Sequence, residues 1–130
     1  MKQIRNYKYS ILVAIAIVVL STIPVPEIKP LEEVPLIDKW VHFLMYAVLS
    51  TAMWWDLRSR HQKIMTSYYL LMLILPTLLG GLMELAQAYL TTCRSGDWWD
   101  AIADAIGSVI GTVVCYLIGS IWKEKTSIRR

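Results

Sequence analysis

Three ionisable side chains fall inside apolar stretches of this 130-residue sequence: His42, Glu84 and Asp104. Ionisable groups at such positions are uncommon and usually serve a function. A histidine near carboxylates can act as a general acid or base, which makes these three residues the candidate catalytic groups. Carboxylate oxygens also suit a divalent cation such as Mg²⁺ or Mn²⁺. No motif requires a cofactor, and Asp97, Asp100 and Asp104 are the alternative ligands for such a cation.

The stretches that carry these residues have the length and composition of membrane-spanning helices. The sequence is 56% hydrophobic and 18% charged, unlike an ordinary soluble, disordered or disulfide-stapled protein. Four apolar stretches, at about residues 9–23, 36–55, 67–90 and 101–122, approach the roughly 20 residues that cross a bilayer. A spanning segment must be helical, because an open strand leaves backbone groups unpaired in lipid. We therefore predict an all-α fold, with one polytopic membrane domain over residues 1–130 and four transmembrane helices in a small bundle.

Basic residues indicate how the chain is oriented. Ten of the 13 Lys and Arg residues lie in the N-terminal segment, in the linker at 56–66 and in the C-terminal tail. Because such residues collect on the cytoplasmic side of a membrane, we predict a multi-pass protein with both termini in the cytoplasm. The six Trp residues fall near predicted helix ends, as expected at a membrane interface. As an alternative, the basic N-terminus followed by Ile11–Leu20 also fits a signal peptide.

Helix geometry is expected to bring the polar residues together. At about 1.5 Å per residue, His42, Glu84 and Asp104 each lie roughly 9 Å inside the outer end of a different helix. Small and polar residues recur at helical spacing around each of them. The three stripes are Asp38, His42 and Met45 with Tyr46 beside them, then Thr77, Gly80, Glu84, Gln87 and Thr91, then Asp97, Asp100, Asp104, Gly107, Ser108, Gly111 and Cys115. We predict a polar pocket that opens to the outside, walled by the second, third and fourth helices, with the first helix as a lipid-facing support.

Small residues and a proline are expected to shape the helix packing. Glycines spaced four apart let two helix backbones approach closely, and a glycine pair can pack or bend a helix. The candidate packing positions are Gly80, Gly81, Gly107 and Gly111. Pro76 is expected to kink the third helix and to free a carbonyl that a neighbour or water must satisfy. Cys93 and Cys115 differ too much in predicted depth to form a disulfide.

Each polar residue also has a structural interpretation. Glu84 and Gln87 could form a hydrogen-bonded clasp between helices, and His42 could be a packed histidine with satisfied nitrogens. Asp97 and Asp100 could simply cap a helix, since carboxylates are favoured at helix N-termini. The two basic residues near the outer pocket, Lys39 and Arg94, could be ordinary surface charges.

Four motifs follow one another in a set order along the chain. They are Asp38-Lys39-x-x-His42-Phe43-x-x-Tyr46, Glu84-x-x-Gln87, Arg94-x-x-Asp97-x-x-Asp100 and Asp104-x-x-Gly107-x-x-x-Gly111. This ordered set resembles the VanZ-like family, which often has Asn where this chain has the added charge of Asp104. The resemblance implies a small integral protein of the bacterial cytoplasmic (inner) membrane with a role in the cell envelope. The namesake is linked to low-level resistance to teicoplanin, a lipoglycopeptide that acts on cell-wall precursors, so a contribution to antibiotic resistance is expected.

The predicted pocket, together with this resemblance, suggests a binding or remodelling function. Its ligand would be a lipid-linked cell-wall precursor or a lipoglycopeptide, with membrane lipids around the bundle. Lys39 and Arg94 could contact phosphate, because Arg in particular can do so through two hydrogen bonds. The candidate ligand-binding residues are Asp38, Lys39, His42, Tyr46, Glu84, Gln87, Arg94, Asp97, Asp100 and Asp104.

Two alternatives belong to other classes of function. A membrane enzyme could act on a lipid-linked envelope substrate through His42 and the carboxylates, although no nucleophile or phosphatase motif is present. A structural partner in a membrane complex could use the basic tail at 123–130. Nucleic acid is not an expected partner, because the basic residues follow the membrane rule and form no basic face. The oligomeric state does not follow from the sequence.

Overall fold

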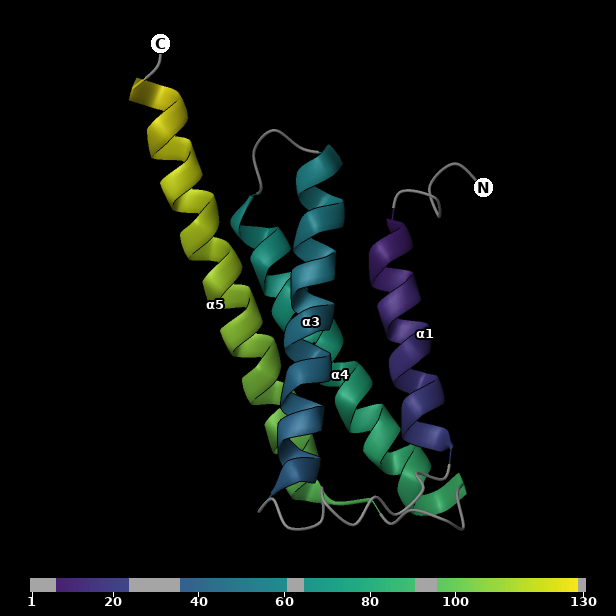
Figure 1. Ribbon diagram of the computed structural model, residues 1–130. Coiled ribbons are helices and arrows are strands. Elements are labelled where there is room, and N and C mark those ends of the chain that lie inside the picture. The colour runs from purple at the N-terminus through teal and green to yellow at the C-terminus, as the bar shows by residue number, and fades with distance from the viewer. Residues whose placement is uncertain (1–6, 24–35, 61–64, 91–95, 129–130) are drawn as a thin grey trace.

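The computed structural model describes residues 7–23, 36–60, 65–90 and 96–128. This part of the chain forms four α-helices: α1 (Lys8–Thr22), α3 (Ile37–Arg60), α4 (Thr66–Leu90) and α5 (Trp98–Ile128). The helices form a bundle in which the start of α1 and the end of α5 lie at the same end (Figure 1). The predicted all-α, four-helix bundle is confirmed for these residues.

Two helices extend beyond the ranges expected from hydropathy. α3 continues to Arg60 rather than ending near residue 55, and α5 runs from Trp98 to Ile128 rather than over 101–122. Asp56 is therefore helical and not part of a linker. Hydropathy marks only the apolar part of a helix, whereas the helical propensity of Leu, Arg, Lys and Glu carries the backbone further.

The helices differ in their suitability for a membrane. α4 and the part of α5 up to Trp122 are long and apolar enough to cross one, with mean hydropathies of 1.8 and 2.0 over 18 residues. Within these 18-residue segments of α4 and α5, only 28% and 39% is buried inside the bundle. Most of their apolar side chains therefore face outward. α1 is apolar but has only 15 residues, and α3 has 24 residues with charged groups near both ends. By length and composition, two of the four described helices qualify as spans.

Two glycines allow the close approach of α3 and α5, which share the most extensive helix contact in the bundle. A Cβ atom at Gly107 would overlap the backbone of Phe43, and one at Gly111 would lie 2.7 Å from the carbonyl oxygen of Ala47. Any larger residue would push the two backbones apart. Gly81 differs, because a Cβ there would meet no atom within 4 Å, and the packing does not depend on it.

A serine of α3 compensates for the proline inside α4. Pro76 has no backbone N–H, so the carbonyl of Met72, four residues earlier, lacks its usual helical donor. The buried Ser50 hydroxyl donates to this carbonyl oxygen at 3.1 Å. The freed carbonyl is thus satisfied by a neighbouring helix.

Two polar contacts attach α1 to its neighbours. One carboxylate oxygen of the buried Asp56 accepts hydrogen bonds from the Ser10 N–H at 2.8 Å and from the Ser10 hydroxyl at 2.6 Å. Near the other end of α1, the Gln87 side-chain amide donates to the Ser21 carbonyl oxygen at 2.9 Å. The first helix is therefore held at both ends by directional bonds to α3 and α4.

The Ser50 hydrogen bond leads to a prediction that a double-mutant cycle can measure. Ser50→Ala should lower the free energy of unfolding by about 1–3 kcal/mol, because the Met72 carbonyl is then buried without a donor. In a Pro76→Ala background the same change should cost clearly less, since the new N–H at position 76 supplies that donor. Unfolding in detergent micelles measures both values.

A matched control for this cycle is Ser120→Ala. The exposed Ser120 hydroxyl bonds only within its own helix, to the carbonyl of Leu117, so its loss should cost less than about 0.5 kcal/mol. An equal cost of Ser50→Ala in both backgrounds would contradict the proposed compensation.

Candidate functional site

The start of α3, the end of α4 and the start of α5 lie at the end of the bundle opposite the start of α1 and the end of α5 (Figure 1), and polar side chains of these three helices meet there. His42 comes from the first part of α3, Glu84 from the last part of α4 and Asp104 from the first part of α5. Their exposed fractions are only 3%, 4% and 0%. Helical periodicity brings them to the inner faces, and the antiparallel course of neighbouring helices brings them to one depth.

His42 lies at the centre of this group. Its Nδ1 is 3.0 Å from Oδ1 of Asp104, a hydrogen-bond distance, and 3.8 Å from Oε1 of Glu84. Its Nε2 is 3.8 Å from Oδ2 of Asp100. Both ring nitrogens therefore face carboxylates, and the imidazole links α3 to both α4 and α5.

Lys39 lies one turn before His42 and nearer to the surface. Its Nζ is 2.6 Å from Oδ2 of Asp97, 2.7 Å from Oδ1 of Asp100 and 3.4 Å from Oδ2 of Asp38. The Lys39 side chain is 25% exposed, whereas that of Asp100 is only 7% exposed. The ion pairs thus run from the surface into the buried group.

Asp97 caps α5, as its structural interpretation predicted, and also pairs with Lys39. Its Oδ1 accepts the N–H of Trp99 at 2.9 Å, which caps α5, while its Oδ2 accepts from Lys39. The Asp97 N–H also donates to Oε2 of Glu84 at 2.8 Å. The Lys39 ammonium, followed by the Trp99 N–H, holds the pKa of Asp97 below its usual range.

Two glycines make room for these contacts. A Cβ at Gly80 would lie 2.6 Å from Oδ2 of Asp104, so this glycine of α4 accommodates the carboxylate from α5. A Cβ at Gly96 would lie 2.5 Å from the carbonyl oxygen of Glu84. Gly96 therefore lets the residues before α5 pack against α4. Gly80 is a packing position predicted from the sequence, whereas Gly96 is not, although its place next to Asp97 was the available signal.

Apart from Oδ1 of Asp100, which forms an ion pair with Lys39 at 2.7 Å, three buried oxygen atoms of the group have no hydrogen-bond partner among the described residues. They are the Tyr46 hydroxyl, Oε1 of Glu84 and Oδ2 of Asp104. Two of the three are carboxylate acceptors, and Tyr46 lies close enough to both carboxylates to interact electrostatically with them. Such groups are costly to bury unless something pairs with them.

Other predicted site residues lie in different surroundings. Gln87 is buried, and its side-chain amide donates to a backbone carbonyl of α1. This contact is a hydrogen-bonded clasp between helices, which was the structural interpretation of this residue. Asp100 was expected near the surface but is buried, because α5 begins earlier than hydropathy suggested and turns this residue inward. Asp38 stays half exposed at the rim. Arg94 lies outside the described residues.

Metal binding is geometrically possible in two places. Two sets of three residues each offer one nitrogen or carboxylate oxygen per residue, and within each set these donor atoms lie within 4.8 Å of one another. The sets are His42, Glu84 and Asp104, and Asp38, His42 and Asp100. The set expected from the sequence, Asp97, Asp100 and Asp104, is not one of those found among the described residues.

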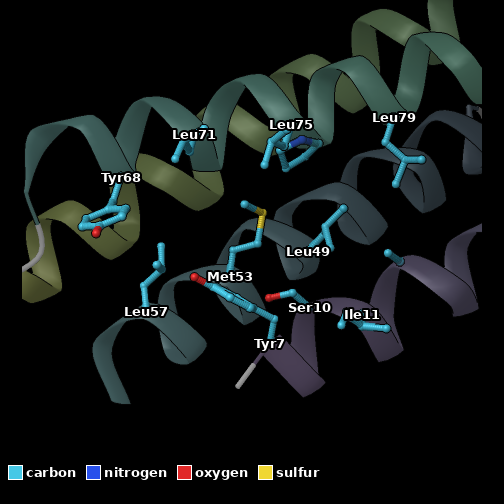
Figure 2. A pocket seen from close by; sticks show the side chains of 12 residues that line it. Tyr7, Ser10, Ile11, Leu49, Met53, Leu57, Tyr68, Leu71, Leu75 and Leu79 are labelled. Atoms are coloured by element: carbon cyan, nitrogen blue, oxygen red, sulfur yellow. The ribbon is translucent and has the colours of Figure 1, made fainter. Parts of the chain in front are cut away.

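A separate cavity of about 380 Å³ lies between α1, α3 and α4 (Figure 2). Figure 2 shows Leu71, Leu75 and Leu79 of α4 facing Met53 of α3, with Ile11 of α1 closing one side. This cavity is apolar and has α1 as a wall, unlike the predicted pocket of three polar helices. The polar residues do meet, whereas this apolar cavity lies in another part of the bundle.

The Lys39–Asp97 pair gives a prediction about titration. Because folding lowers the pKa of Asp97, this pair stabilises the fold above the ordinary pKa of aspartate and stops doing so as the pH falls through the folded value. Lys39→Gln should raise the pKa of Asp97, and Lys39→Arg should keep it low. Carbon-detected NMR titration of labelled Asp97 in micelles measures this, and an unchanged pKa in Lys39→Gln would contradict it.

Comparison of the chain with protein-family models, curated proteins and solved structures finds no match. The resemblance to VanZ-like proteins therefore depends on the residues between Asp38 and Gly111 themselves.

Proposed function

We propose that this chain is a multi-pass protein of the bacterial cytoplasmic membrane, related to the VanZ-like family, that binds the polar part of a lipid-linked or lipoglycopeptide ligand. The observation that carries the proposal is a group of buried oxygens that have no hydrogen-bond partner within the described helices, contributed by three helices just beneath a surface lysine. The ligand would enter beside Lys39, and its apolar tail would lie along the bundle in the lipid.

The outer surface of the bundle supports a membrane location. Large apolar side chains are exposed along α5 from Ile102 to Ile121, at positions spaced by three and four residues. They include Ile102, Ile106, Val109, Ile110, Val113, Val114, Leu117, Ile118 and Ile121. Apolar surface of this extent on a monomer marks contact with a membrane or a partner. The alternating course of the helices is consistent with all four crossing together.

The distribution of charge supports the proposed orientation. The start of α1, the end of α3 and the end of α5 share one end of the bundle (Figure 1), and most basic residues of the sequence lie at or beyond these helix ends. By the positive-inside rule this end is cytoplasmic. The polar group at the other end then faces the outer leaflet.

The charges of the group indicate what chemistry it would bind. Five carboxylates surround one lysine and one histidine, and the charge of Lys39 is already shared between Asp97 and Asp100. The unpaired atoms are mainly acceptors. Hydroxyl or ammonium donors, such as those of a sugar or an amine, therefore suit the group better than a phosphate does. This differs from the expectation that Lys39 contacts phosphate.

The geometry favours binding over catalysis. A general base needs a nitrogen within reach of the proton that it removes, whereas Nδ1 of His42 is at hydrogen-bond distance from Asp104 and Nε2 lies in the buried interior, 3.8 Å from Asp100. The imidazole is therefore engaged in holding α3, α4 and α5 together.

Ligand binding can be tested with a lipoglycopeptide, teicoplanin, and the protein in nanodiscs. Tyr46→Phe removes a hydroxyl that has no partner among the described residues, so folding should be unaffected while binding weakens. Glu84→Gln keeps an acceptor for the Asp97 N–H but loses the charge. Calorimetry should show Kd rising about threefold or more for Tyr46→Phe and about tenfold for Glu84→Gln.

The control for this binding experiment is Leu82→Ala, which changes an exposed residue of α4 and should leave Kd unaltered. Identical Kd values in Tyr46→Phe, Glu84→Gln and the unmodified protein would refute the proposed site. Absence of binding to teicoplanin in the unmodified protein would remove the lipoglycopeptide as the ligand.

The orientation can be tested with the two native cysteines. Cys93, in the linker between α4 and α5, lies outside the described residues and is expected on the outer side, while Cys115 is buried. A membrane-impermeant maleimide should label Cys93 in intact cells or spheroplasts. In a Cys93→Ser background, Ser59→Cys at the exposed end of α3 should react only after permeabilisation. The opposite pattern would reverse the topology.

A further inference from the structure

We infer that His42, Glu84 and Asp104 together bind one divalent transition-metal cation, such as Zn²⁺ or Mn²⁺. The inference assigns an ion to the same buried oxygens that we propose as acceptors for a ligand's donors, and it can be tested without any ligand. It differs from the cation site that the sequence suggested, which used Asp97 and Asp100 in place of His42 and Glu84.

The spacing of the donor atoms fits one ion. Nδ1 of His42 lies 3.0 Å from Oδ1 of Asp104 and 3.8 Å from Oε1 of Glu84. With bonds of about 2.1 Å, neighbouring ligand atoms are about 3.0 Å apart in an octahedral site and about 3.4 Å apart in a tetrahedral site. The observed separations lie around these values, so small side-chain rotations would complete the site.

The unpartnered atoms point to a missing positive group. Oε1 of Glu84 and Oδ2 of Asp104 are buried without hydrogen-bond partners among the residues described. The two side chains are 5% and 0% exposed, so water offers little compensation. A carboxylate left in this condition is costly. An ion between the three side chains would engage the oxygen of Glu84 and either oxygen of Asp104.

A divalent ion would balance the charge of its three ligands. Lys39 forms ion pairs with Asp97 and Asp100, which leaves Glu84 and Asp104 facing the imidazole. Two carboxylates and a neutral imidazole carry a charge of about −2, which a divalent cation neutralises. A protonated His42 would neutralise only half of it.

The types of donor select the class of cation. An imidazole nitrogen with two carboxylate oxygens suits Zn²⁺ or Mn²⁺, whereas Mg²⁺ and Ca²⁺ prefer oxygen donors alone. The other nitrogen of His42 faces Oδ2 of Asp100 at 3.8 Å. A carboxylate at that position orients a metal-bound histidine and is a common outer partner in metal sites. Lys39 in turn holds Asp100 in place.

The second possible set is less suitable for an ion. Asp38 is half exposed, and Asp100 already pairs with Lys39 at 2.7 Å. An ion bound there would lie near the ammonium of Lys39 and would be repelled by it. Asp38 therefore provides the matched acidic control for the experiment.

The inference can be tested by metal analysis of tag-free protein in detergent, without any ligand. After chelation and reloading with Zn²⁺, mass spectrometry should find about one ion per chain. Reloading with Co²⁺ should give visible absorption bands. His42→Ala, Glu84→Gln and Asp104→Asn should each weaken binding by at least about tenfold, while Asp38→Asn and Asp97→Asn should retain it.

Circular dichroism separates loss of the site from loss of the fold, because each variant must keep the helicity of the unmodified protein. Glu84→Gln is the least disruptive test, since it preserves the acceptor for the Asp97 N–H. No bound Zn²⁺ or Mn²⁺ in the unmodified protein, or binding that survives in Glu84→Gln and His42→Ala but fails in Asp38→Asn, would overturn the inference. Teicoplanin binding by the metal-free protein would leave the proposed function intact.

Discussion

The hydrogen bond between His42 and the fully buried Asp104 is the contact on which the bundle's polar end depends. It joins α3 to α5 and can form only because Gly107 and Gly111 bring these two helices close together. Gly80 then leaves space for the Asp104 carboxylate beside α4. A shift of either helix by one turn, about 5 Å, would break this hydrogen bond. The glycines set the distance between the helices, and the ionisable pair sets their register.

The same division of roles recurs elsewhere in the bundle. Apolar contacts between helices in lipid give little directional preference, so hydrogen bonds and close packing decide how the helices align. Ser10 with Asp56 aligns α1 with α3, and Ser50 with the Met72 carbonyl aligns α3 with α4. Asp56 had no such role in the sequence analysis, because its partner is 46 residues away in the chain.

Periodicity and depth were sufficient to predict the four helices and the meeting of His42, Glu84 and Asp104. Both depend on local geometry, which a sequence records directly. Hydropathy could not give the ends of α3 and α5, because charged residues can continue a helix beyond its apolar part. Nor could it show that Gln87 turns toward α1. Whether a group of polar residues surrounds an open pocket depends on how side chains from several helices pack together. The residue pattern of a single helix does not contain this information.

The composition of the buried group is itself an argument for function. If its purpose were only to hold the helices together, amides or well-packed apolar residues would serve with a smaller desolvation cost. Instead Glu84 and Asp104 keep carboxylate oxygens buried and unpaired within the described structure, next to an imidazole already shared between them. An arrangement of this kind is stable only when a cation, a proton or a donor from a ligand completes it. The identity of such a partner would determine what this end of the bundle can do.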